Sequence, residues 1–157
     1  MSKQSAGILA YRFNHVGLLQ VLLVHPGGPF FKNKDHGAWS IPKGEYEPDE
    51  DPLQVALREF EEETGNVITG DAFIQLSLVK LKSGKLITAW AVENDFEQCY
   101  ISSNMFTMEW PPKSGKQQLF AEVDKAEWFG IAEAAIKINV GQLPLLGELE
   151  RKIAKGH

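Results

Sequence analysis

The segment Gly44–Gly65, GEYEPDEDPLQVALREFEEETG, constrains the fold more than any other part of the chain. Asp51 followed by Pro52 is typical of a helix start, because an aspartate can cap a helix and proline suits its first position. Gly65 is a typical helix stop. The segment therefore predicts a helix between these residues, with a side-chain cap at Asp51.

This predicted helix has two distinct faces. Apolar residues recur at helical spacing on one of them, namely Leu53, Ala56, Leu57 and Phe60. Glu59, Glu62 and Glu63 lie at i, i+3 and i+4, so their side chains project together away from the core. Like charges at these spacings destabilise a helix by ~0.2–0.5 kcal/mol each. Their position near the helix C-terminus is also unfavourable.

Local rules broken together at one spot tend to mark function. A divalent cation that prefers oxygen ligands, Mg²⁺ or Mn²⁺, would offset the repulsion between the carboxylates. The alternative is a solvated acidic face with no ligand.

The remaining chain predicts a mixed sheet covered by helices, a fold of the α+β or α/β class. Predicted strands cover residues 5–13, 17–25, 38–41, 73–81, 86–93, 105–120 (broken by a loop) and 121–129. Predicted helices after the acidic segment cover residues 131–138 and 143–154. The long loop 26–37 holds three glycines and two prolines, and loops of that length are often functional.

Composition narrows the class of protein. The length of 157 residues suits one domain, residues 1–157. A net charge of −5 gives no basic footprint for nucleic acid. Cys99 is the single cysteine, which excludes an internal disulfide and a cysteine-based zinc site. Without a targeting signal or a membrane-length apolar run, we expect a cytoplasmic protein with no membrane partner.

The acidic segment resembles the Nudix box, G-x5-E-x7-R-E-U-x-E-E-x-G-U, in which U is a bulky apolar residue. Gly44, Glu50 and the run Arg58–Gly65 match every fixed position before the last one. Only the final apolar position differs, because Asn66 stands there. The order of predicted strands and helices also resembles the Nudix fold. The resemblance implies an α/β/α sandwich, with helices flanking a mixed sheet.

The resemblance implies Mg²⁺-dependent hydrolysis of a diphosphate linkage in a nucleoside diphosphate joined to another group, with Mn²⁺ as a substitute. The substrate would be a dinucleoside polyphosphate, a nucleoside triphosphate or a nucleotide sugar. Glu59, Glu62 and Glu63 would bind metal. Glu59 or another glutamate would deprotonate or orient the attacking water. Arg58 would hold Glu59 through a charge-assisted hydrogen bond. Glu62 is thus expected to act in catalysis as well as in metal binding.

Further residues are expected to complete the site. Glu50 would support it from the helix start, and the loop carbonyl next to Gly44 would supply another metal oxygen. Lys43, adjacent to Gly44, would bind phosphate. A late glutamate is expected to join the metal ligands, and Glu122 is preferred to Glu109, although Glu122 could equally be a surface acid.

Other residues near the predicted site have simpler explanations. His36 and the lysines of the two loops, Lys32, Lys34, Lys113 and Lys116, could reach a phosphate or could simply be solvated. Trp39 is predicted to pack in the core. The run WSIPKGEYE resembles a segment of diadenosine polyphosphate hydrolases. The stretch LVKLKSGK lacks the tyrosine or proline that marks two Nudix substrate groups, so the nucleotide stays open.

The sequence leaves two alternative functions. A catalytically inactive Nudix-fold module that senses a nucleotide or binds a protein would be expected to lose box glutamates, and this chain keeps them. A Nudix-like isomerase of an isoprenoid diphosphate would need a catalytic cysteine, and Cys99 has no signature around it. The oligomeric state stays open, with a homodimer as one alternative.

Overall fold

A computed structural model describes residues 3–155 of the chain. Its main sheet is mixed, with strand order β4-β6-β1-β2-β9; β3 pairs with β1, and β5 pairs with β6. These strands are β1 (Gln4–Phe13), β2 (Leu19–Pro26), β3 (Lys43–Glu45), β4 (Ile74–Gln75), β5 (Val79–Lys80), β6 (Leu86–Glu93) and β9 (Val123–Gly130). A separate two-stranded sheet pairs β7 (Met105–Glu109) with β8 (Gln117–Ala121).

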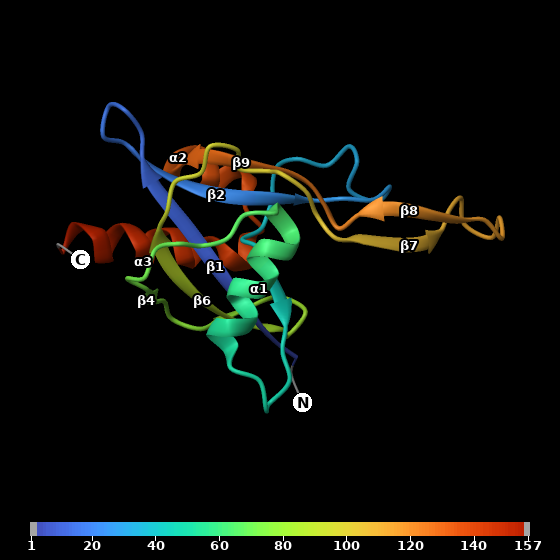
Figure 1. The fold of residues 1–157 in the computed structure, drawn as a ribbon, viewed down its shortest axis with the longest axis horizontal. Coiled ribbons are helices and arrows are strands. Elements are labelled where there is room, and N and C mark those ends of the chain that lie inside the picture. The colour runs from blue at the N-terminus through green and yellow to red at the C-terminus, as the bar shows by residue number, and fades with distance from the viewer. Residues whose placement is uncertain (1–2, 156–157) are drawn as a thin grey trace.

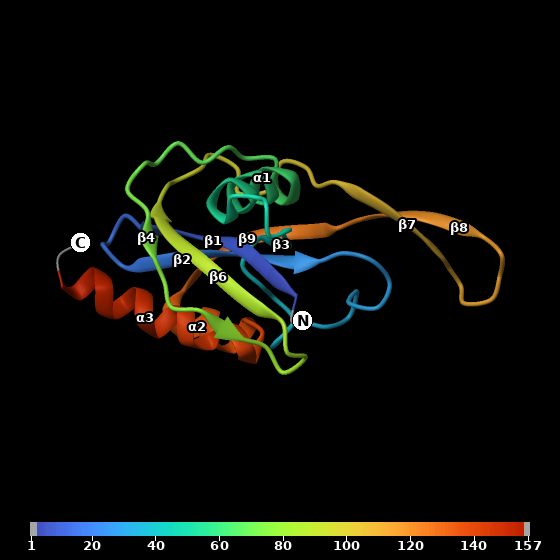
Figure 2. The same ribbon diagram turned by 90° about the horizontal axis from the view of Figure 1, so that it is seen from below.

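Helices cover both faces of the main sheet. The helix α1 (Pro52–Thr64) lies on one face, and α2 (Ile131–Lys137) and α3 (Leu143–Ala154) lie on the other (Figure 1; Figure 2). This arrangement confirms the predicted α/β/α sandwich. Among residues 3–155, no helix is long and apolar enough to cross a membrane.

The central strand β1 explains why two cores form. Alternate side chains of a strand point to opposite faces. Ile8 and Ala10 therefore pack beneath α1, while Leu9 and Tyr11 pack beneath α2 and α3. Because both faces are covered, the strand is apolar along nearly its whole length. The predicted pairing of the first two strands is confirmed as an antiparallel contact between β1 and β2.

The predicted strand 38–41 is wrong. Trp39 and Ser40 each form only an isolated bridge, and the strand in this region is β3, which pairs with β1. Pro42 cannot donate a backbone hydrogen bond, and its carbonyl accepts one from Ile8 N at 3.1 Å. Trp39 is 3% exposed, which confirms its predicted place in the core.

Two other predicted strands are divided. The stretch 73–81 forms β4 and β5, and both pair with β6, so the predicted hairpin is confirmed with an interrupted first strand. Residues 105–120 form the β7–β8 hairpin, which projects away from the main sheet (Figure 1). The predicted strand 121–129 and both late helices are confirmed to within a few residues.

Both ends of α1 lie where they were predicted. Gly65 has the left-handed φ of 80°, and its N–H bonds to Glu61 O at 2.8 Å. The predicted side-chain cap is wrong, since the Asp51 side chain makes no capping hydrogen bond. Asp51 contributes its carbonyl instead, which accepts from Val55 N at 3.1 Å.

Candidate active site

The strand β3 lies directly against the carboxylate side of α1. A Cβ atom built on Gly44 would lie 2.1 Å from Glu59 Oε1, well inside van der Waals contact. A side chain at this position would force the Glu59 carboxyl, the flexible end of its side chain, to move aside. Gly44 and Glu59 are therefore in contact, although they are 15 positions apart in the chain.

Glu63 differs from the expectation that all three carboxylates face away from the core. It is 9% exposed and lies beside Lys43. Glu63 is three residues after the fully buried Phe60, so it stands at the border of the apolar face. Burial, and then repulsion by Glu59, raises the pKa of Glu63 to about 9. Burial also lowers the pKa of Lys43.

Glu59 is half-buried and has its own carboxylate neighbours. Burial, followed by the proximity of Glu62, raises its pKa to about 7. Both raised pKa values mean that the folded protein disfavours the ionised form of these two carboxyl groups. The same arrangement would favour a cation among them, because a positive charge stabilises the ionised form of a carboxyl group.

Arg58 contacts different partners from the one expected. Its Nη1 lies 3.5 Å from Glu50 Oε2, and its Nε lies 3.9 Å from Glu62 Oε1. No hydrogen bond from Arg58 to Glu59 occurs among residues 3–155. Glu50 also accepts from Glu47 N at 2.9 Å, and this bond and Arg58 hold its pKa below the usual range. Arg58 and Glu50 thus form an ion pair at the edge of the acidic face.

The segment before β7 brings Glu122 to this face. Asn104 N donates to Glu62 O at 2.9 Å, and Glu122 N donates to Asn104 O at 2.8 Å. The backbone of Asn104 therefore links the end of α1 to Glu122 through two hydrogen bonds. Burial and the Glu62 charge raise the pKa of Glu122. Nothing in the sequence around Asn104 signals this bridge.

The alternative late glutamate, Glu109, lies in the β7–β8 hairpin. Its carboxylate accepts hydrogen bonds from Lys113 N at 3.1 Å and Gly115 N at 3.0 Å, so it caps the hairpin turn. His36 is exposed and lies 3.9 Å from Asp35, with no contact to the carboxylate face among the described residues.

Sequence reasoning missed His25. This side chain is 2% exposed, and its Nδ1 lies 2.7 Å from Asp124 Oδ1. Its Nε2 lies 2.7 Å from the carbonyl of Lys34, so that nitrogen donates. His25 therefore ties the loop 26–37 to β9. A polar residue at the end of an apolar strand was the only signal available.

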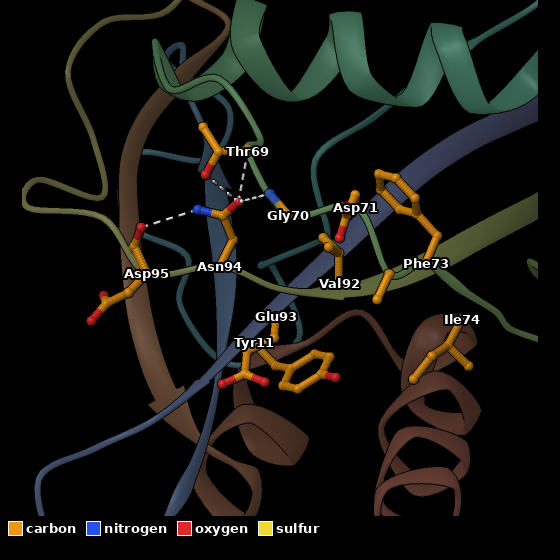
Figure 3. Close-up of a pocket in the computed structure, with 11 residues that line it drawn as sticks. Tyr11, Thr69, Gly70, Asp71, Phe73, Ile74, Val92, Glu93, Asn94 and Asp95 are labelled. Carbon is orange, nitrogen blue, oxygen red and sulfur yellow. Dashed lines mark hydrogen bonds between the residues drawn. The ribbon is translucent and has the colours of Figure 1, made fainter. Parts of the chain in front are cut away.

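Residues of β2, β3, α1 and the start of β9 line a cavity of about 280 Å³. Its lining includes Lys43, Glu63 and Glu122 from three separate segments. A larger cavity of about 770 Å³ lies elsewhere, where β1 and β6 end (Figure 3). Within it, Asn94 Oδ1 accepts from Thr69 N and Gly70 N at 2.8 Å each. None of the predicted site residues lines this larger cavity.

The donor chemistry of the smaller cavity fits a divalent cation, since carboxylate oxygens are the ligands that such ions prefer. Among residues 3–155, no three His, Cys, Asp or Glu side chains converge as a ready coordination sphere. The carboxylates are close enough to shift one another's pKa, but Glu59 is turned onto Gly44. Metal binding therefore requires side-chain rotation within a region that is already assembled.

A family model supplies the decisive comparison. The model described as NUDIX domain matches residues 1–149, nearly the whole chain. The chain belongs to the Nudix family. Nudix proteins generally hydrolyse pyrophosphate bonds and typically use divalent metals. Among curated proteins, no sequence matches this chain.

Solved Nudix structures share the fold. The NUDIX domain of Shewanella oneidensis NrtR, complexed with ADP ribose, is 19% identical and superposes with a TM-score of 0.67, covering 98% of this chain and 89% of that one. A Caenorhabditis elegans Ap4A hydrolase is 23% identical, with a TM-score of 0.63 and coverage of 96% and 98%. A mutT/nudix family protein from Listeria innocua is 17% identical, with a TM-score of 0.64 and coverage of 98% and 94%.

Proposed function

We propose that this chain is a Mg²⁺-dependent hydrolase that cleaves a diphosphate linkage in a nucleoside diphosphate joined to another group. The observation that carries the proposal is the group of buried or half-buried carboxyls with raised pKa values, Glu59 and Glu63, beside Gly44 and Lys43. Perturbed titratable groups gathered at a cavity favour a catalytic site over a solvated acidic face. Mn²⁺ is the expected substitute cation.

The metal-binding residues in this proposal are Glu59, Glu62, Glu63 and Glu122. When bound, the cation would neutralise phosphoryl oxygens and activate water. Because diphosphate is itself negative, an acidic site without that charge would repel the substrate. Glu59 or another of these glutamates would accept the proton of the attacking water, and the choice between them stays open.

The chain's other residues would bind and orient the substrate. Lys43 lines the cavity next to Glu63 and would bind a phosphate oxygen through its ammonium group. Its burial keeps the side chain in place, so little rotamer entropy would be lost on binding. Arg58 would position Glu62 and Glu50 and would have no direct contact with the phosphates. Little covalent chemistry is required of the protein in such a reaction.

A panel of substrates tests the proposal. It contains dinucleoside polyphosphates, nucleotide sugars, ADP-ribose and nucleoside triphosphates, each with Mg²⁺ or Mn²⁺, and products are identified by mass and phosphate release. We expect hydrolysis of at least one compound, its loss on chelation with EDTA, and near-complete loss in Glu62→Gln. Full activity in EDTA would contradict the metal requirement.

The alternative, a catalytically inactive nucleotide-sensing or protein-binding module, predicts binding without turnover across the whole panel. Retention of Glu59, Glu62 and Glu63 argues against it. The same proposal takes residues 1–157 as one catalytic domain that works in the cytoplasm on a small nucleotide, without a nucleic-acid partner. A homodimer stays a prediction, which sedimentation analysis would test.

A further inference from the structure

The connection between β6 and β7, which the structure describes in full, contains no helix or strand, yet it is bonded to the end of α1. We call its residues 98–104 the strap. Thr64 O accepts a hydrogen bond from Ile101 N at 2.7 Å, and Glu62 O accepts one from Asn104 N at 2.9 Å. The last carbonyls of a helix have no partner within the helix. The strap therefore satisfies backbone carbonyls at the end of α1 that carries the acidic face.

The two residues that follow α1 bring the strap still closer. A Cβ atom on Gly65 would lie 2.9 Å from Ser102 N, so the backbone of the strap packs directly on this glycine. Asn66 is 9% exposed, and its Nδ2 donates to Gln98 O at 2.8 Å. Asn66 stands where the box pattern has a bulky apolar residue. The departure from the pattern therefore supplies a hydrogen bond to the strap that an apolar side chain could not make.

The strap is also bonded to the chain at Glu122. Glu122 N donates to Asn104 O at 2.8 Å. The next residue is held on both of its backbone groups, because Val123 N donates to Ser103 Oγ at 3.0 Å and Tyr100 OH donates to Val123 O at 2.7 Å. The strap therefore joins the end of α1 to two consecutive residues at the start of β9.

The main sheet alone does not fix the position of Glu122. β9 pairs with β2 in regular register as far as Lys125, and the register then shifts at Pro26. Proline has no N–H to donate to the ladder, and a bulge of this kind bends the strand and interrupts its pairing. Glu122 lies beyond this irregularity. Gly27 N donates to Glu122 O at 2.9 Å and holds one side of the residue, and the strap holds the other side.

The strap thus sets the spacing between proposed metal ligands that come from two separate segments. Glu63 of α1 and Glu122 line the same cavity. After burial, the nearby charge of Glu62 raises the pKa of Glu122, so these two carboxyls are close. Distances from a metal to its ligands vary by only about 0.2 Å between sites. Ligands on separate segments therefore need a firm connection between those segments.

We propose that Asn66 and Tyr100 are positioning residues that hold Glu122 beside Glu62 and Glu63, so that Glu122 joins the metal ligands of α1. Each side chain acts through the hydrogen bonds of the strap and not by contact with metal or substrate. The inference rests on the proposed hydrolytic function and assigns a role to the one position at which the chain departs from the box.

Metal binding tests the inference independently of turnover. Mn²⁺ is titrated alone into the wild type, Asn66→Ala and Tyr100→Phe, and binding is followed by electron paramagnetic resonance. We expect each variant to bind Mn²⁺ about 10-fold more weakly, because groups that orient metal ligands contribute about 10-fold to 100-fold to affinity. Asn94→Ala is the matched control, since Asn94 is 8% exposed and its Oδ1 accepts from Thr69 N and Gly70 N, outside the strap. Its affinity should equal that of the wild type.

A double-mutant cycle shows whether the effect passes through Glu122. In a Glu122→Gln background, Asn66→Ala should change the affinity for Mn²⁺ less than about twofold, because the ligand that Asn66 positions is already lost. An equal loss in both backgrounds, or no loss in either, would overturn the inference. Thermal melts in EDTA identify any variant that is unfolded at the assay temperature. Tyr100→Phe removes only a hydroxyl, so it keeps the test decisive if Asn66→Ala is too unstable.

Failure of the proposed function is recognised separately. A wild type that binds Mn²⁺ and hydrolyses none of the substrate panel contradicts the hydrolytic function, and the binding data still decide on the strap. A wild type that binds neither Mn²⁺ nor Mg²⁺ contradicts the metal requirement, and hydrogen exchange in EDTA then decides on the strap. Faster exchange of the Glu122 amide in Asn66→Ala supports the positioning role, because that N–H is bonded to Asn104 O. Unchanged exchange contradicts it.

Discussion

The two cavities of this protein differ in the electrostatics of the carboxyl groups that line them. The cavity at the ends of β1 and β6 (Figure 3) holds about 770 Å³. The cavity beside α1 holds about 280 Å³. In the larger one, Asp95 pairs with Arg12 at 2.9 Å, and this bond lowers the pKa of Asp95. In the smaller one, burial and repulsion raise the pKa of Glu63 to about 9.

In the proposed function the site lies at the smaller cavity, so cavity volume alone would not locate it. The polar groups of the larger cavity are largely satisfied, as when Asn94 Oδ1 accepts from two backbone N–H groups and stabilises the loop that follows α1. The smaller cavity contains the carboxyl groups of Glu63 and Glu122, whose charged form is disfavoured by burial. Unfavourable electrostatics that the fold retains at one cavity is typical of a site that binds a ligand of opposite charge. Four predictions test this distinction.

The largest effect is expected from two proposed metal ligands, Glu63 in the lining of the smaller cavity and its neighbour Glu62 on α1. Glu62→Gln and Glu63→Gln should each lower metal-dependent turnover at least about 100-fold, because each removes a charged metal ligand. Asp71→Asn, in the lining of the larger cavity, should change turnover less than twofold. Steady-state kinetics with Mg²⁺ measures both. Comparable losses from the two cavities would remove the distinction.

The next effect concerns the close approach of β3 and α1. Gly44→Ala should lower turnover by about 10-fold at most, because the new Cβ forces the flexible Glu59 side chain to move and alters how it is held beside β3. Gly70→Ala is the matched change at the larger cavity, where a Cβ would lie 2.7 Å from Glu93 O. It should lower stability and leave kcat unchanged. Kinetics and a thermal melt on each variant separate the two outcomes.

A third prediction assigns a structural role to Asn94. Asn94→Ala leaves two loop N–H groups without their acceptor, so the free energy of unfolding should fall by about 1–3 kcal/mol. Because Asn94 is remote from the carboxylates, kcat/KM below the melting temperature should stay within twofold. Urea unfolding measures the first quantity. A selective loss of catalysis would instead place the larger cavity in the mechanism.

The smallest effect is the pH dependence of the metal-free protein. The raised pKa values of Glu59 and Glu63 mean that the folded state binds more protons than the unfolded state between about pH 4.5 and pH 9. Stability should therefore fall as pH rises through this window. We expect the melting temperature in EDTA to drop by about 3 °C or more across it. Mg²⁺ should reverse the drop.

Two variants control this measurement. Glu63→Gln should flatten the decline, because an uncharged amide has no proton to lose. Asp95→Asn should leave the decline unchanged, since the lowered pKa of Asp95 contributes stability that is present above about pH 4 and lost on acidification. A melting temperature that rises with pH in EDTA would contradict the raised pKa values.

Local patterns predicted much of the secondary structure. The spacing of Ala56 and Phe60 and the stop at Gly65 predicted α1, because helical period and left-handed caps depend on neighbours in the chain. The strand predicted at 38–41 failed for the opposite reason, because strand pairing does not depend on neighbours in the chain. Its pairing depends on β1 and β2, which lie far away in sequence, and β1 pairs with Lys43–Glu45 instead.

The sequence by itself determined that Glu59, Glu62 and Glu63 share one side of a helix, since that follows from 3.6 residues per turn. It also determined the family, through the spacing of the box. Only the tertiary structure decided that Glu63 is buried, that Gly44 lies beneath Glu59, and that Asn104 carries Glu122 to the same cavity. These outcomes depend on packing between distant segments, and burial rather than residue type sets the pKa values that distinguish this site.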